Sequence, residues 1–155
     1  MYKILGGLQL GLRYIKEEDI EQLEQLDSKC FPEQIRYNRY ALRYYLSLPN
    51  SIAFLEDSNG IIIGFIIATI TDQISANIVT IDIDPRFRKQ AIGSKLIIIL
   101  KRILKELEIT KITLQVAEDN KIATKFYSKH GFEIKKRLPM YYPSTDGLLM
   151  ECRIG

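Results

Sequence analysis

The chain has 155 residues, of which 46% are hydrophobic and 26% are charged. These proportions are those of an ordinary globular protein and argue against a disordered or fibrous one. The length suits one domain, so we expect residues 1–155 to form a single compact unit. The 22 basic and 19 acidic residues leave a net charge of +3, which is too small to indicate a nucleic-acid partner.

Residue usage disfavours three further classes of protein. Cys30 and Cys152 are the only cysteines, and no CxxC pair or Cys/His cluster is present, so we expect neither disulfides nor a metal site. The N-terminus lacks the small-residue cleavage site of a secretory signal. The most apolar run, at residues 61–70, is much shorter than the ~20 residues of a membrane helix. We therefore expect a cytoplasmic protein with no membrane partner.

The first half of the chain is predicted to supply a strand, two helices and three more strands. Residues 8–15 form the first strand, and the acidic residues after Lys16 suit the positive end of a helix dipole. Phe31-Pro32 breaks that helix, and a second helix is expected at about 37–48. Strands are expected at 51–56, 61–71 and 77–84, the first two joined by a hairpin turn at 57–60.

The second half of the chain contains the strongest amphipathic pattern. Apolar residues recur at helical spacing up to residue 108, namely at Ile92, Leu96, Ile99, Leu100, Ile103 and Leu107. A strand is predicted at 111–117, a short helix at 120–129 that ends at Gly131, and two closing strands at 132–136 and 148–154. The resulting order, β-α-α-β-β-β-α-β-α-β-β, predicts one mixed α/β layer structure.

A phosphate-binding loop is predicted where the strand at 77–84 leads into the long helix. Few large side chains lie near the helix entrance, so backbone amides are left free at its positive end. Arg86, Arg88, Lys89 and Lys95 add positive charge nearby. A phosphorylated cofactor is the predicted ligand, although a basic helix N-terminus with solvated lysines gives the same pattern. Neither a Walker loop nor a dinucleotide fingerprint is present.

The spacing Arg88-x-x-Ala91-x-Gly93 resembles the Q/R-x-x-G-x-G/A pyrophosphate motif of GNAT acetyltransferases. The resemblance implies that acetyl-coenzyme A is the cofactor, held by this loop and by the backbone of the preceding strand. The residues implied are Asp82, Ile83, Asp84, Arg88, Lys89, Gln90, Ala91, Ile92, Gly93, Ser94 and Lys95. Ala91 departs from the preferred glycine, which costs little at helical backbone angles but ~1–2 kcal/mol in a left-handed conformation. We expect cofactor binding to be reduced but not abolished.

A second segment, Asn120-x-x-Ala123-x-x-x-Tyr127-x-x-x-Gly131-Phe132, resembles the N-x-x-A-x-x-x-Y-x-x-x-G-F signature of the same superfamily. With the element order, the resemblance covers roughly residues 8 to 154 and implies a GNAT fold with a mostly antiparallel central sheet. It implies that Asn120 binds the pantetheine arm and that Tyr127 contacts the cofactor. Tyr127 would protonate the thiolate that leaves when an amine attacks the thioester.

The resemblance also raises a question about Asp82, whose counterpart in the family is small, apolar and close to the acetyl group. Asp82 is expected either to contact the substrate amine or to be a solvent-facing strand residue. His130 is the only histidine, and it follows the tyrosine motif at the end of a helix. There a cation would suit the helix dipole, and we favour that role over a catalytic one.

The segment from Arg137 to Gly147 resembles the R-x-x-Y-Y-P-x-x-D-G loop of RimI-type ribosomal-protein alanine acetyltransferases and their archaeal relatives. The resemblance implies that the substrates are the N-terminal α-amino groups of proteins or peptides. Tyr141 and Tyr142 would face the first substrate residues, unless they merely pack in a hairpin turn. Phe31, Pro32 and Glu33 resemble the opposite wall, where Glu33 could bind substrate, act as a base through water, or be an ordinary loop carboxylate.

The main departure from RimI-like enzymes is Gln115, because that branch carries a glutamate general base there. Gln115 cannot accept a proton. A peptide α-amine has a pKa of ~8, so about a tenth of it is already neutral at pH 7, whereas a lysine at ~10.4 is almost fully charged. Losing the base is therefore more tolerable for N-terminal substrates, and Glu33, Glu118 or water could replace it.

Two other functions remain possible at this point: acetylation of a small amine, and a non-catalytic acetyl-coenzyme A-binding module. A small-amine enzyme would more often line its cleft with acidic residues and lack the Tyr141-Tyr142 segment. A dead module would be expected to lose Tyr127. We expect a monomer or weak homodimer, with a possible auxiliary subunit.

Overall fold

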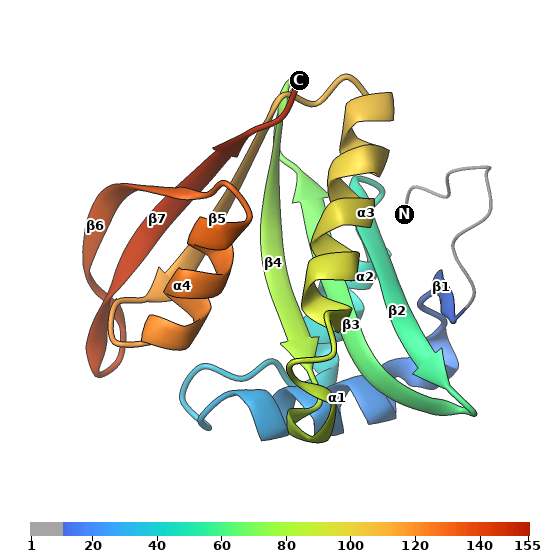
Figure 1. Ribbon diagram of the computed structural model, residues 1–155. Coiled ribbons are helices and arrows are strands. Elements are labelled where there is room, and N and C mark those ends of the chain that lie inside the picture. Colours follow the sequence, from blue (N-terminus) through green and yellow to red (C-terminus); the bar gives the residue numbers. More distant parts are fainter. Residues whose placement is uncertain (1–10) are drawn as a thin grey trace.

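The computed structural model describes residues 11–155 (Figure 1). Its core is a seven-stranded sheet in the order β1-β2-β3-β4-β5-β7-β6, mixed but mostly antiparallel as expected, with only β4 and β5 parallel. The strands are β1 (Leu12–Tyr14), β2 (Ser51–Ser58), β3 (Ile61–Ile70), β4 (Ser75–Ile83), β5 (Lys111–Ala117), β6 (Glu133–Tyr142) and β7 (Thr145–Arg153). Residues 8–10 of the predicted first strand lie outside the described part of the chain.

Four α-helices cover the two faces of the sheet. They are α1 (Ile20–Cys30), α2 (Arg39–Ser47), α3 (Ile92–Glu106) and α4 (Lys121–Lys129), and two short 3-10 helices stand at Glu17–Asp19 and Pro85–Phe87. α3 and α4 pack over one apolar cluster, while α1 and α2 pack over a second one on the opposite face (Figure 1). None of the helices in residues 11–155 is long and apolar enough to cross a membrane.

The periodic pattern predicted for α3 is confirmed. Five of the six apolar residues in the predicted pattern are buried within the helix, because they recur on one face: Ile92, Leu96, Ile99, Leu100 and Ile103. The helix ends at Glu106, two residues earlier than expected, since Glu108 adopts a positive φ of 63°. The second helix also begins later, at Arg39, where the Asn38 side chain accepts a hydrogen bond from the Ala41 amide.

The segment predicted as a loop at 137–147 is instead part of a β-hairpin. β6 continues to Tyr142 and β7 begins at Thr145, and these two residues face each other across the turn. The pairing is interrupted between Leu138 and Tyr142, where Met140 takes a left-handed φ of 52°. Nearly every residue of β6 is exposed. The strand predicted at 132–136 is therefore longer than expected, because residues 137–142 lack the buried face whose alternation would have indicated a strand.

The sheet divides along the boundary between β4 and β5. Their parallel pairing runs from Ser75 opposite Lys111 to Ile78 opposite Leu114 and stops there, although both strands continue. The break coincides with a bulge in β4, since Ile67 faces Thr80 and its neighbour Ala68 faces Ile78, leaving Val79 as the extra residue. A bulge bends its strand and increases its twist. Past this point β4 diverges from β5 (Figure 1).

The loop that leads into α3 is tightly bent. Lys89 and Ala91 have positive φ values of 64° and 62°, and Ala91 is the N-cap residue of the helix. Of the two conformations considered for Ala91 from the sequence, the structure therefore has the left-handed one. Because a left-handed alanine crowds its Cβ against the following carbonyl oxygen, this position stores about 1–2 kcal/mol of strain.

Ala91→Gly is expected to raise the free energy of unfolding by about 0.5–1 kcal/mol, because relief of the strain exceeds the entropy that glycine adds to the unfolded chain. Urea unfolding measures the change. Ala123→Gly is the matched control: Ala123 lies within α4, where the same substitution should destabilise by about 1 kcal/mol. A loss of stability in both variants would show that Ala91 is not strained.

Candidate functional site

The predicted cofactor loop lies at the open end of β4. α3 begins after Ala91 without a side-chain cap, and its first intrahelical bond runs from the Lys95 amide to the Ala91 carbonyl at 3.0 Å. The amides of the first turn thus point out of the helix with no intrahelical acceptor. Packing favours Gly93, because a Cβ there would lie 3.1 Å from the Phe126 ring of α4 and the ring would have to shift. This end of α3 fits an anion.

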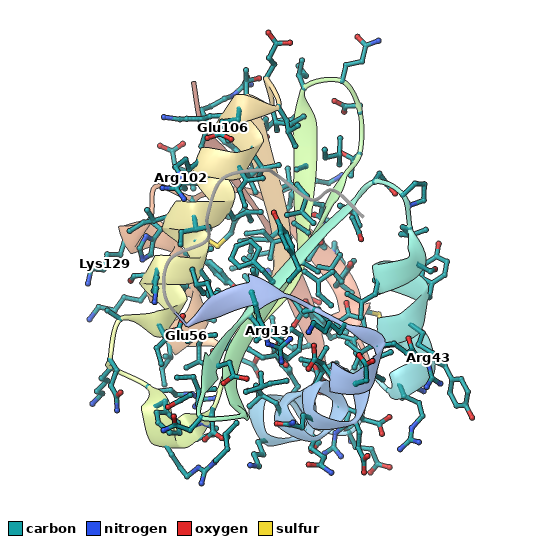
Figure 2. All side chains as sticks on the ribbon, turned by 90° about the vertical axis from the view of Figure 1, so that its right-hand side faces the viewer. Arg13, Arg43, Glu56, Arg102, Glu106 and Lys129 are labelled. Carbon is teal, nitrogen blue, oxygen red and sulfur yellow. The ribbon has the colours of Figure 1, made fainter. Side chains whose placement is uncertain are left out.

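Two of the cations predicted to surround the loop are paired with carboxylates, and the other two are exposed. The Lys95 ammonium lies 3.0 Å from a Glu56 carboxylate oxygen on β2 and so turns away from the loop; Figure 2 labels Glu56 between β1 and α3. Arg86 pairs with Asp84 at 3.0 Å, and this pairing lowers the pKa of the Asp84 carboxyl to about 2. Arg88 and Lys89, with Gln90, remain exposed at the loop.

His130 connects the end of α4 to the start of α3. Its Nε2 lies 2.8 Å from the Ser94 Oγ, and its carbonyl accepts a hydrogen bond from the Lys101 ammonium. Burial lowers the pKa of the imidazole, with Lys101 and Lys129 contributing in the same direction. His130 is therefore held as a neutral hydrogen-bonding group. Burial, and to a smaller extent the two lysines, disfavours the cation expected at this helix end.

Tyr127 lies in α4 on the face that packs against the sheet. Its ring makes edge contacts with Phe126 and Phe132 at centroid distances of 5.4 and 5.7 Å. Burial raises the pKa of its hydroxyl above the ordinary value, with further contributions from Asp82 and Tyr142, so Tyr127 keeps its proton at neutral pH. Asn120 caps the same helix, its Oδ1 accepting from the Ala123 amide at 3.1 Å, which leaves its amide nitrogen as the group for a ligand.

A cleft of about 440 Å³ opens on the α2 face of the sheet, beside the point where β4 and β5 part. It brings together Gln115 and Tyr141 from the predicted site with residues that were not predicted. The lining consists of Tyr37, Tyr45, Thr69, Thr71, Asn77, Val79, Thr113, Gln115 and Tyr141. None of these side chains carries a charge at neutral pH. Hydroxyl and amide groups therefore supply the polarity of the cleft.

The tyrosine-bearing hairpin is shaped by the other residues of its sequence motif. Asp146 accepts a hydrogen bond from the amide of Met140, the left-handed residue, at 2.7 Å, and pairs with Arg137 at 2.8 Å. A Cβ on Gly147 would lie 2.9 Å from the Tyr141 Cβ, so only glycine lets Tyr141 cross β7 there. The Tyr141 and Tyr142 rings contact edge to face at 4.9 Å. The motif thus fixes the direction of the tyrosines.

Tyr37 forms the opposite side of the cleft. Burial raises the pKa of its hydroxyl, and the next contributions come from Tyr45, Tyr141 and Tyr142, which places its ring near the hairpin. Burial also raises the pKa of Tyr142, to about 12. No site role was predicted for Tyr37, since it stands outside every motif. Its one signal was the density of tyrosines between residues 37 and 45.

The remaining predicted residues are placed as follows. Phe31 ends α1, its amide donating to the Asp27 carbonyl at 3.0 Å, and Pro32 and Glu33 are exposed in the loop that follows. Glu118, a candidate base, forms an ion pair with Arg137 at 2.9 Å, which makes its carboxylate less available to accept a proton. Asp82 is fully buried, and the expectation of a solvent-facing strand residue was wrong because helices cover both faces of β4.

Comparisons with known proteins agree with this fold. The model of the "Acetyltransferase (GNAT) family" matches residues 20–132. N-alpha-acetyltransferase 30 of Dictyostelium discoideum is 33% identical over 132 residues, which cover 83% of this chain and 70% of that protein. The crystal structure of Ard1 from Thermoplasma volcanium has a TM-score of 0.85 at 27% identity and covers 93% of this chain and 97% of that one.

The fold is also that of the ribosomal-protein-S18-alanine N-acetyltransferase from Escherichia coli, with a TM-score of 0.84 at 19% identity over 93% of both chains. The family model spans most of the chain, and it includes both motifs together with β4 and β5, the two strands between which the sheet divides. The chain therefore belongs to the GNAT family of acetyltransferases.

Proposed function

We propose that this acetyltransferase moves the acetyl group of acetyl-coenzyme A to the N-terminal α-amino group of proteins or peptides, by direct attack in a ternary complex. The observation that carries the proposal is the position of the neutral, tyrosine-walled cleft. It opens where β4 leaves β5, so an amine held in the cleft reaches the strand edge that the cofactor would occupy. The similarity to N-alpha-acetyltransferases supports the same assignment.

The residues present fit acetyl-coenzyme A. Beyond Ile78 the β4 edge has no strand partner on the β5 side among residues 11–155, which suits an extended amide-containing arm. The uncapped amides of α3 and the exposed Arg88 and Lys89 suit the pyrophosphate. When bound, the cofactor supplies an acetyl thioester as the acyl donor. Gln90, Ile92, Gly93, Ser94 and Asn120 would complete the contacts.

Tyr127 is the proposed proton donor. Its hydroxyl is protonated at neutral pH, and the thiolate that leaves as the amine attacks has a pKa of ~8.5 when free. Transfer from a partly buried tyrosine to a thiolate is uphill, so the donor must be held at the sulfur as the bond breaks. The ring contacts with Phe126 and Phe132 provide that fixed position.

The composition of the cleft argues against a small polycationic amine as substrate. Sites for such amines need carboxylates to balance the charge, and the residues that line this cleft include none. A peptide N-terminus carries one amine of modest pKa and a backbone rich in hydrogen-bonding groups. Hydroxyl and amide side chains match that chemistry. Tyr141, Tyr142 and Tyr37 would contact the first residues, with Phe31, Pro32 and Glu33 at the outer edge.

The substrate assignment is tested by measuring acetylation of short peptides that differ at residues one and two. We expect acetylation of free N-termini and almost none of N-terminally blocked peptides whose only amine is a lysine, because that amine is charged at pH 7. Polyamines serve as the competing class. Faster acetylation of a polyamine than of every peptide would replace the N-terminal assignment with a small-amine one.

Tyr127→Phe is expected to lower kcat by ~10²–10⁴-fold, since the proton donor is lost while the ring still packs. The shift in melting temperature with saturating acetyl-coenzyme A should persist. Tyr14→Phe, a hydroxyl deletion on β1 at the far edge of the sheet, is the matched control and should retain the parent kcat. An unaffected rate in Tyr127→Phe would make Tyr127 a packing residue only.

Gln115→Glu should raise kcat/KM for peptides near pH 7 by no more than about tenfold, because about a tenth of an α-amine is already neutral and only the remainder needs a base. The gain should vanish at acidic pH, where the new carboxylate is protonated. Gln115→Met, similar in length but unable to take a proton, is the control. Equal rates in the two variants would assign proton removal to water or to another residue.

A further inference from the structure

Two carboxyl groups lie buried between α1 and β4 and have no part in the mechanism above. Asp27 stands on the apolar face of α1 beside Leu23 and Leu26, and Asp82 stands on β4; both are 0% exposed. A buried ionised carboxylate is costly unless it is paired or neutralised. Two such groups side by side therefore need a specific arrangement.

Each carboxyl of the pair accepts one hydrogen bond through its Oδ1 atom and leaves its Oδ2 atom without one. The Thr80 hydroxyl donates to Asp82 Oδ1 at 2.6 Å, and the Tyr37 amide donates to Asp27 Oδ1 at 2.7 Å. The two Oδ2 atoms are buried without a hydrogen-bond partner, and the two carboxyls are close enough for each to shift the pKa of the other. Ionised carboxylates only accept hydrogen bonds, so a bond between them requires one proton.

The proton belongs on Asp82. Burial raises the pKa of Asp82 well above its usual range, and the charge on Asp27 and the bond between the carboxyls raise it further. Burial also raises the pKa of Asp27, but the bond to Asp82 and the bond from the Tyr37 amide favour its charged form. A proton on Asp82 would let its carboxylic acid donate to the Asp27 carboxylate and would satisfy both Oδ2 atoms.

Four other ionisable groups face this pair. Arg36, in the loop before α2, carries a permanent charge that favours the Asp27 carboxylate. Cys30 on α1, Tyr37 before α2 and Tyr127 on α4 are neutral at physiological pH, since burial raises the pKa of all three, that of Cys30 to about 11. They supply neither a second proton nor a compensating cation to the pair.

We propose that Asp27 and Asp82, joined by one shared proton, are positioning residues that fasten Tyr37 to strand β4. Tyr37 is held at both ends: its amide bonds to Asp27, and its hydroxyl lies 3.5 Å from the Val79 carbonyl at the bulge of β4. Tyr37 lines the cleft, so the pair fixes the substrate-facing wall to the cofactor-facing strand. The roles of this wall and this strand in binding substrate and cofactor rest on the proposed function, whereas the shared proton and the positioning of Tyr37 do not.

The shared proton is tested through the pH dependence of stability. Asp82 is protonated when folded and ionised when unfolded above pH ~4, so folding takes up one proton and the unfolding equilibrium constant rises about tenfold per pH unit from this group. Asp82→Asn removes that contribution, because its amide can donate to Asp27 without titrating. The stability of Asp82→Asn relative to the parent should therefore increase from pH 5 to pH 8.

Asp84→Asn is the matched control for this measurement. Asp84 is an aspartate of the same segment, but its pKa is lowered to about 2, so it is ionised in both states above pH 5. The free energy of unfolding of Asp84→Asn should therefore change with pH in the same way as that of the parent protein over that range. If the free energy of unfolding of Asp82→Asn also changed with pH in the same way as that of the parent, no proton would be shared and the proposal would be rejected.

The hold on Tyr37 is tested by hydrogen exchange of its amide and by peptide kinetics. Asp82→Ala should speed exchange of the Tyr37 amide and raise the peptide KM, each by about tenfold, with kcat changing less. Asp82→Asn should restore slow exchange and a lower KM, because the bond to Asp27 is remade. If no peptide is acetylated, the proposed function fails, while the exchange data still decide the positioning role. If the Tyr37 amide still exchanged slowly in Asp82→Ala, and the peptide KM were unchanged wherever activity is found, the positioning role of the pair would be rejected.

Discussion

The early end of the β4–β5 ladder is the constraint on which the rest of the site depends. Pairing stops at Ile78 opposite Leu114, and the bulge at Val79 turns β4 away from β5. Backbone groups of β4 that would otherwise bond to a neighbouring strand are left for an extended ligand. The same divergence opens the cleft that Val79 and Gln115 line on the α2 face. A continuous ladder would remove both features at once.

The two walls of the cleft are fixed by buried or backbone interactions more than by packing of their own rings. On one side, Asp146 holds the left-handed Met140 and Gly147 leaves space for Tyr141. On the other side, Asp27 holds the backbone of Tyr37. Rigid placement of this kind matters for the proposed reaction, because an amine must meet the acyl carbon within a narrow range of distance and angle. The Tyr141 ring, which is half exposed, could not by itself provide it.

Much of the fold could be predicted from the sequence, and the exceptions have physical causes. α3 and the strands with a buried face show their period in the sequence, and the spacing of Tyr127 to Gly131 located α4 correctly. The first part of β6 was predicted as a strand, but its continuation from residue 137 to 142 was taken for a loop, since an edge strand with both faces exposed shows no alternation. Asp82 was misplaced because a bulge shifts the side-chain alternation and helices cover both faces of β4. Asp27, on the apolar stripe of α1, was a visible signal that was not used.

The neutral character of the cleft bears on how the proposed reaction proceeds with Gln115 in place of a carboxylate. A nearby carboxylate would stabilise the ammonium form of a substrate and raise the pKa of its amine. A base in that position therefore accepts the proton but also makes the ammonium group harder to deprotonate. Tyrosine, threonine and amide side chains do not favour the charged form over the neutral one to the same extent, and desolvation in such a cleft lowers an amine pKa. For an α-amine that begins near pKa 8, a modest lowering makes the neutral nucleophile the major form at pH 7. A lysine side chain, starting more than two pKa units higher, would remain charged. On this argument the loss of the base narrows the choice of substrate toward N-termini more than it weakens catalysis.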